Sequence, residues 1–214
     1  MRNRNTRTFW NQKIVETKRH LLKSPIYLDK NNIVTNFLYS LNGNLLNVGV
    51  GYGSLEKFLV DRRTKLNLFG IDISDEAIRK ANKFVKGKFF VASVLRLPFE
   101  NKFFDFVTAL DVLEHLRAEE LVVALNEIKR VLKDGGVLIV SVPLNESEVD
   151  RKTNRHEVSF TKPDAVKLLE GNGFEVKKVT LLYAFRNSYL IKTLITRVFR
   201  LKQPNLIIMF CRKK

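Results

Sequence analysis

Short apolar runs alternate with segments of helical period through most of this chain. The apolar runs predict strands at 44–49, 66–73, 88–93, 103–111, 136–143, 174–182 and 204–214. The segments of helical period predict helices at 54–63, 74–86, 118–133 and 161–173, with Gly135-Gly136 ending the third. Strands that alternate with helices indicate an α/β fold, a doubly wound and mainly parallel sheet. Ligands of such sheets bind outside the carboxyl ends of the strands.

Three glycines stand at the junction of the first predicted strand and helix, in "LLNVGVGYGSLEKFL" at 45–59. Gly49, Gly51 and Gly53 allow a tight turn with positive φ and let a ligand approach the backbone. Ser54 is the predicted cap of the helix that follows, whose free N–H groups favour anionic or polar ligands. Asp72 ends the second predicted strand, where an acid can accept hydrogen bonds from ribose hydroxyls. The junction therefore predicts a site for a nucleotide-like ligand.

Four segments together resemble a known family, the class I S-adenosylmethionine-dependent methyltransferases, and within it the enzymes of small molecules and lipids. The segments read "LNVGVGYG", "GIDIS", "SVLRLPFENKFFDFV" and "DVLEHL", and the resemblance extends over about residues 43–182. It implies a Rossmann-like methyltransferase fold with a seven-stranded sheet, a reversed last strand, and S-adenosylmethionine as the cofactor.

The resemblance also implies a role for individual residues toward that cofactor. The implied cofactor-binding residues are Asn47, Gly49, Gly51, Gly53, Asp72, Ile73, Ser93, Val94, Leu95 and Asp111. The glycines and Asp111 would lie at the methionine end, Asp72 at the ribose, and the others of 72–95 around the adenine. Two positions depart from the family pattern: Asn47 and Ser93 stand where an acid is usual. Both changes predict weaker cofactor binding.

The segment "DVLEHL" places a histidine after the fourth predicted strand, near the mouth of the predicted site. His115, with an ordinary pKa near 6.5, is the predicted catalytic base for an oxygen acceptor, and a helix-start or packing role is the alternative. Glu114 and His156 are the predicted substrate-side residues, and anchoring of its own loop is the alternative for His156. The sequence predicts no metal site. Its single cysteine, Cys211, excludes an internal disulfide and predicts a buried thiol in the last strand.

The formal net charge of +16 is unevenly distributed. Residues 1–43 have a net charge of +6 and residues 176–214 of +10, whereas 44–175 have none. Residues 1–43 are predicted to be a basic cap segment and 44–214 the methyltransferase domain, with a basic amphipathic insertion at 183–204. The insertion has helical period over 188–202, with apolar positions on one side and Lys192, Arg197 and Arg200 on the other. Basic ends favour an anionic partner, and solubility alone is the alternative.

These observations predict an enzyme that transfers a methyl group from S-adenosylmethionine to a small, lipidic or acidic acceptor. Two alternatives stay open: an RNA methyltransferase that uses the basic termini, and a catalytically silent S-adenosylmethionine-binding module. An anionic membrane surface is a further predicted partner of the amphipathic segment. Because the sequence shows neither a signal-peptide core nor a membrane-spanning apolar run, it predicts a cytoplasmic protein, with peripheral membrane contact as a further expectation.

Overall fold

The computed structural model describes residues 5–16, 24–183, 194 and 203–214. Among them are the strands β1 (Asn42–Val48), β2 (Lys65–Asp72), β3 (Lys88–Val91), β4 (Phe104–Leu110), β5 (Leu132–Pro143), β6 (Phe174–Leu182) and β7 (Leu206–Lys213). The helices are α1 (Arg7–Glu16), α2 (Pro25–Leu38), α3 (Ser54–Asp61), α4 (Asp75–Phe84), α5 (Ala118–Val131), α6 (Glu148–Asn154), α7 (Lys162–Gly171) and the short 3-10 helix η2 (Leu113–His115).

The strands form one sheet in the order β3-β2-β1-β4-β5-β7-β6. β1 pairs in parallel with both β2 and β4, and β7 pairs antiparallel with both β5 and β6. The prediction of a mainly parallel, seven-stranded sheet with a reversed last strand is therefore confirmed. The chain order changes direction between β1 and β4, so the carboxyl ends of these two strands flank the position where doubly wound sheets bind ligands.

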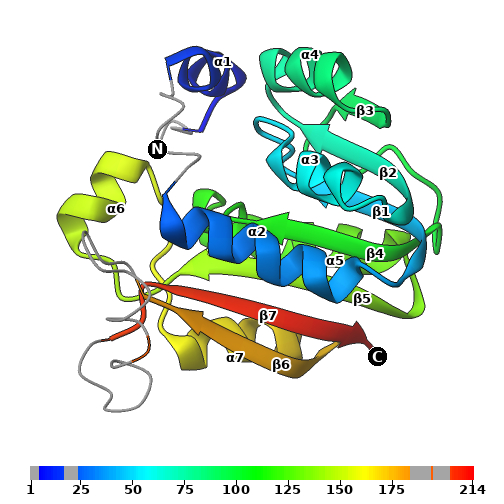
Figure 1. Ribbon diagram of the computed structural model, residues 1–214. Coiled ribbons are helices and arrows are strands. Elements are labelled where there is room, and N and C mark those ends of the chain that lie inside the picture. Colours follow the sequence, from blue (N-terminus) through cyan, green and yellow to red (C-terminus); the bar gives the residue numbers. More distant parts are fainter. Residues whose placement is uncertain (1–4, 17–23, 184–193, 195–202) are drawn as a thin grey trace.

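Helices cover both faces of the sheet because neighbouring residues of each strand point to opposite sides. On β1, Leu45 packs in a cluster with apolar residues of α2, α3 and α4, whereas Leu46 packs with those of α5 and α7. Both leucines are fully buried. Figure 1 shows α2 crossing one face of the sheet, with α5 on the other. Cys211 is buried in β7 as predicted, and burial raises the pKa of its thiol to about 12.

Two predicted helix ends are wrong. Gly53, not Ser54, is the cap residue of α3; it has φ 69°, and Ser54 is the first residue of the helix. Helix α5 ends at Val131 rather than at the glycine pair, because Leu132 is extended, fully buried and paired with Phe104. The glycines consequently lie inside β5, beside an irregularity in its pairing with β4.

In the described part of the chain, three α-helices have no counterpart among the predicted elements: α1 and α2 before the sheet, and α6 between β5 and β6. The short helix η2 was not predicted either. Figure 1 shows α6 beyond the carboxyl ends of the parallel strands, and α1 on the same side next to α4. The predicted amphipathic helix at 188–202 lies outside the described residues except for Leu194. No helix in the described part of the chain is long and apolar enough to cross a membrane.

Candidate active site

A cavity of about 740 Å³ opens at the carboxyl ends of the parallel strands. This volume lies within the range of small-molecule and cofactor pockets, about 300–1,000 Å³. The predicted residues that line it are Asn47, Gly49, Gly51, Asp72, Ile73, Ser93, Val94, Leu95, Asp111 and His115. Gly53, Glu114 and His156, which were also predicted, are not among its lining residues. The strand ends thus bring together ten residues that span 69 positions of sequence.

The glycines after β1 have different structural tasks. Gly49 has φ 77°, and a Cβ atom there would lie 2.5 Å from Val112 Cγ2. Both the backbone conformation and the lack of space therefore disfavour a side chain at this position. At Gly51, with φ 54°, a Cβ atom would meet nothing within 4 Å. The Gly51 backbone is therefore open to a ligand in the cavity that it lines. At Gly53 a Cβ atom would make an ordinary contact with Ala81 Cα at 3.6 Å, so the positive φ of 69°, and not lack of space, favours glycine there.

Asp72 is held in place by backbone donors. Its Oδ2 accepts a hydrogen bond from the Gly51 N–H at 2.9 Å, and its Oδ1 accepts one from the Ser74 N–H at 2.8 Å. Burial raises the pKa of the carboxyl group, and these backbone hydrogen bonds partly oppose the rise. Because each carboxylate oxygen has more than one lone pair, both can accept further bonds from a ligand's hydroxyls.

Asn47 has a buried acid behind it that sequence reasoning missed. The Asn47 Nδ2 donates to Glu56 Oε1 at 2.7 Å, and its Oδ1 accepts from Thr108 Oγ1 at 2.8 Å. Glu56 is 1% exposed, and desolvation raises the pKa of its carboxyl group to about 7. Asn47 on β1 has no carboxyl group, but its hydrogen-bond partner Glu56 on α3 supplies one directly behind it.

An ion pair links the N-terminal helices to the end of β4. Lys30 Nζ of α2 contacts Asp111 Oδ2, and the Ser141 hydroxyl donates to Asp111 Oδ1 at 2.5 Å. Lys30 is only 4% exposed, and Asp111 has a positive φ of 55°. A non-glycine residue in this conformation costs free energy and often marks a functional site. No motif identifies Lys30, since "LDKNN" reads as a solvated polar run.

Helix α1 covers one side of the cavity. The Asn5 side chain donates to the carbonyl oxygens of His115, at 2.9 Å, and Arg155, at 3.1 Å. The Trp10 ring packs edge to face on the His115 ring, with 4.7 Å between centroids. Arg7 pairs with Asp75, at the start of α4. Helix α1 therefore attaches to both sides of the cavity, and Arg7, Trp10, Lys13 and Ile14 line it.

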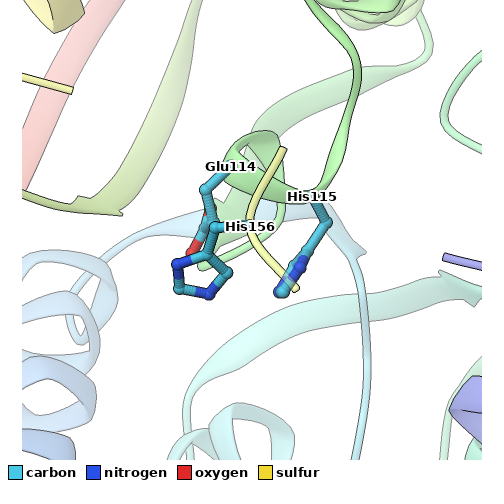
Figure 2. Close-up of side chains that lie close together, drawn as sticks. All are labelled: Glu114, His115 and His156. Atoms are coloured by element: carbon cyan, nitrogen blue, oxygen red, sulfur yellow. The ribbon is translucent and has the colours of Figure 1, made fainter. Parts of the chain in front are cut away.

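Glu114, His115 and His156 meet at the border of the cavity (Figure 2). The first two lie on η2, and His156 lies after α6; the three side chains offer ligand atoms within 4.8 Å of one another. Glu114 is fully buried, and its burial together with the charge of Asp111 raises the pKa of its carboxyl group. Burial and the neighbouring His156 lower the pKa of His115 to about 4. His115 is consequently neutral at pH 7.

Comparisons with known proteins agree with this geometry. Residues 46–140 match the family model described as "Methyltransferase domain". The chain is 33% identical over 132 residues to the uncharacterized protein MJ0638 of Methanocaldococcus jannaschii, covering 62% of this chain and 55% of that protein. It is 29% identical over 157 residues to the sterol 24-C-methyltransferase erg6 of Schizosaccharomyces pombe, covering 62% and 39%. The chain thus spans about half the length of the curated relatives that it matches.

Solved structures share the fold over nearly the whole chain. The N-methyltransferase NodS of Bradyrhizobium japonicum, in complex with S-adenosyl-L-homocysteine, superposes with a TM-score of 0.74 at 14% identity, covering 98% of both chains. A geranyl diphosphate methyltransferase in complex with S-adenosylmethionine gives 0.69 at 12% identity, covering 87% of this chain and 85% of that one.

The sheet order, with its antiparallel β7, and the glycine turn define a Rossmann-like methyltransferase fold. This fold and the match of residues 46–140 to a methyltransferase domain support the predicted class, the class I S-adenosylmethionine-dependent methyltransferases. S-Adenosylmethionine is the cofactor of this family, and the cavity fits it on its own evidence: the open Gly51 backbone lies beside the Asp72 carboxylate. The family assignment predicted from the sequence is confirmed.

Proposed function

We propose that this protein transfers a methyl group from S-adenosylmethionine to a small, apolar or lipidic acceptor. One observation supports it most directly: the glycine turn, Asp72 and Asp111 line one cavity together with apolar and aromatic side chains of the N-terminal helices. The cofactor half and the acceptor half of a transferase site would thus share a single space. In this proposal residues 44–214 are the methyltransferase domain, and 1–43 are its cover.

The cofactor half is assigned to the loops that follow β1, β2 and β3. Gly49 and Gly51 would let the methionine end approach the backbone, and Asp72 would accept hydrogen bonds from the ribose hydroxyls. Ile73, Ser93, Val94 and Leu95 would surround the adenine. Ser93 Oγ already accepts a hydrogen bond from the Leu95 N–H at 3.2 Å, so this loop is ordered by its own serine.

The acceptor half is assigned to α1, α2 and η2. Trp10, Ile14, Tyr27 and Leu116 supply apolar and aromatic surface to the cavity. The cavity's cations, Arg7, Lys13 and Lys30, are equalled in number by its acids, Asp72, Asp111 and Glu120. Because these charges balance, the lining favours an apolar acceptor over an acidic one. Two relatives are similar in this respect by their names: erg6 acts on a sterol, and the UbiE protein of Rickettsia bellii, 35% identical over 111 residues, acts in ubiquinone and menaquinone biosynthesis.

Methyl transfer requires little more than alignment of the methyl donor with the acceptor and exclusion of water from the site. When bound, S-adenosylmethionine supplies a methyl group that a sulfonium already activates. Helix α1 would exclude water from the site, and the Lys30–Asp111 pair would hold α2 against the end of β4. For an oxygen acceptor, the neutral His115 imidazole could take the hydroxyl proton. With its pKa near 4 it is a weak base, so alignment would supply most of the acceleration.

Two measurements test the proposal in sequence. Calorimetry should show binding of S-adenosylmethionine and S-adenosylhomocysteine by the purified chain. Incubation with methyl-labelled cofactor and fractionated lipid, small-molecule and RNA pools should then place the label in the lipid fraction. Cofactor binding without label in any fraction would support the silent binding module, and label in RNA would support the alternative RNA methyltransferase. Absence of cofactor binding would contradict the proposal itself.

A further inference from the structure

We propose that Glu114, His115 and His156 bind a divalent transition-metal ion at the border of the cavity. Each residue offers one ligand atom, and these atoms all lie within 4.8 Å of one another. Figure 2 shows the Glu114 carboxylate beside the His156 ring, with the His115 ring on the other side of the cluster. The sequence predicted no metal here because His156 is 41 positions from His115, and only the fold brings the two together.

Both histidines are oriented as metal ligands usually are. His156 Nδ1 lies 2.6 Å from Glu146 Oε2, and His115 Nδ1 lies 3.3 Å from the Arg155 carbonyl oxygen. An oxygen acceptor at Nδ1 fixes the proton there and leaves Nε2 of each ring as the electron-pair donor. A carboxylate or carbonyl behind a histidine is the typical outer shell of a metal site.

Glu114 supplies the independent sign of a missing ligand. Its side chain is fully buried, and neither carboxylate oxygen has a hydrogen-bond partner. Burial of a carboxyl group without any partner is costly, and buried charges in proteins are generally paired or coordinate a metal. The nearby acids Asp111 and Glu146 disfavour a negative charge on Glu114. The nearby cation Lys30 favours that charge, but it is one cation against two acids. A cation bound by Glu114 would offset this excess of acids.

The ligand chemistry selects the class of metal. Two imidazoles and one carboxylate suit Zn²⁺, Co²⁺ or Fe²⁺, whereas Mg²⁺ and Ca²⁺ prefer oxygen ligands. Zinc–ligand bonds of about 2.0–2.2 Å imply ligand atoms roughly 3.4 Å apart, so side chains within 4.8 Å need only small rotations. Three protein ligands leave a fourth position open, as in catalytic zinc sites.

The open position would face the cavity, because His115 lines it. An acceptor oxygen bound there would be polarised and held near the cofactor half; this last step rests on the proposed methyl transfer, whereas metal binding itself does not. Once its Nε2 binds the ion, His115 can no longer act as a base, and the ion's polarisation of the oxygen would replace that role.

Titration of tag-free, chelator-treated protein with Zn²⁺ and with Co²⁺ tests the site without any cofactor or acceptor. We expect one ion per chain, a rise in Tm with Zn²⁺, and little response to Mg²⁺. Glu114→Gln and His156→Ala should each weaken binding ~100-fold or more, and Glu146→Gln should weaken it roughly 10- to 100-fold through the orientation of His156. The matched control is Glu148→Gln, an exposed glutamate on α6, which should bind like the wild type.

Glu114→Gln removes a buried carboxyl group without a partner, so this variant is expected to fold at least as well as the parent. S-Adenosylhomocysteine binding, measured in parallel without metal, reports on the cofactor half alone. The metal site would be overturned if the wild-type protein bound neither Zn²⁺ nor Co²⁺. It would also be overturned if Glu114→Gln and His156→Ala bound these ions as tightly as the wild type does. Either result would leave the proposed function untouched. Metal binding in a chain that binds no cofactor would have the opposite meaning.

Discussion

The two walls of the cavity differ in how their sequences encode them. The wall at the strand ends is formed by backbone: Gly49 and Gly51 in positive-φ conformations and a carboxylate, Asp72, held by two N–H groups. The wall formed by α1, α2 and η2 consists of side chains, and those of α1 and α2, such as Trp10 and Lys30, come from segments distant in sequence from the strand ends. Backbone conformation requires particular residues at fixed spacing, so it leaves a motif. A side chain that merely reaches a cavity, as those of Trp10 and Lys30 do, leaves none; on this wall η2 is the exception, since it lies within "DVLEHL".

The largest expected effect is on the side-chain wall. His115→Ala should lower turnover by on the order of 100-fold or more, while affinity for S-adenosylhomocysteine should stay within ~3-fold. The reason is that His115 would touch the acceptor, or the ion that holds it, and not the cofactor. Single-turnover kinetics at saturating cofactor, once an acceptor is known, measure the step directly.

Added imidazole distinguishes a chemical role of the His115 ring from a packing role as the cause of that loss of turnover. Recovery of turnover with imidazole supports a proton-accepting or metal-binding role for His115, since either requires only the ring. A variant with near-normal turnover would return His115 to packing against Trp10, and a large loss of cofactor affinity would erase the proposed division between the two walls.

The next effect belongs to the backbone wall. Asp72→Ala should weaken binding of S-adenosylmethionine and S-adenosylhomocysteine by about 1.5–3 kcal/mol, tenfold or more, because a charge-assisted hydrogen bond to the ribose is lost. Calorimetry measures it. The control is Asp61→Ala, the same change at an exposed residue of α3 paired with Lys57. Equal affinity of the Asp72 variant and the parent would remove Asp72 from the ribose.

The contrast between the walls also explains what the sequence could predict. The alternation of strands and helices follows from apolar periodicity, since periodicity records local conformation. The reversed β7 and most of the ten predicted lining residues follow from the family resemblance that the motifs carry. The roles of Lys30 and Glu56 could not be predicted. Lys30 stands in a polar run and Glu56 next to Lys57 in a predicted helix, and the burial of each arises only from packing of helices on a sheet. The cap of α3 was misjudged by one residue because Ser54 is a good capping residue, whereas the turn required the left-handed conformation of Gly53.

Glu56 is a side-chain feature hidden within the backbone wall, and its pKa makes it measurable. With a pKa of about 7 in the folded state and 4.5 as the ordinary value, the folded protein binds more protons between those pH values. The free energy of unfolding should therefore fall as pH rises through that window and level off above it. Glu56→Gln keeps an acceptor for Asn47 and should stabilise the protein by about 1–3 kcal/mol at pH 8, with little effect at pH 4.5.

Urea unfolding of parent and variant at several pH values gives the difference curve, in which the contributions of other buried acids cancel. Glu148→Gln, exposed on α6, is the matched control and should give a flat difference near zero. A flat curve for Glu56→Gln as well would mean that Glu56 is ionised in the folded protein and paired more strongly than its single hydrogen bond to Asn47 indicates.

The smallest effect concerns how an apolar acceptor reaches the side-chain wall. All of the net charge lies in residues 1–43 and 176–214, whereas 44–175 is neutral, so we expect vesicles with anionic lipid to bind the protein better than neutral vesicles. Arg200→Gln, in the segment outside the described residues, should weaken this binding by about 1 kcal/mol, roughly fivefold, at low salt. Vesicle cosedimentation measures it, and the difference should fade as ionic strength rises.

Lys57→Gln makes the same charge change in the neutral body of the chain and should have little effect, because Lys57 is paired with Asp61 on α3. Equal losses in the two variants would mean that total charge, not its location, governs binding. Structured RNA needs a parallel titration because counterion release produces the same salt dependence. Binding of RNA but of neither kind of vesicle would assign the basic ends to nucleic acid, and the side-chain wall would then need another route for its acceptor.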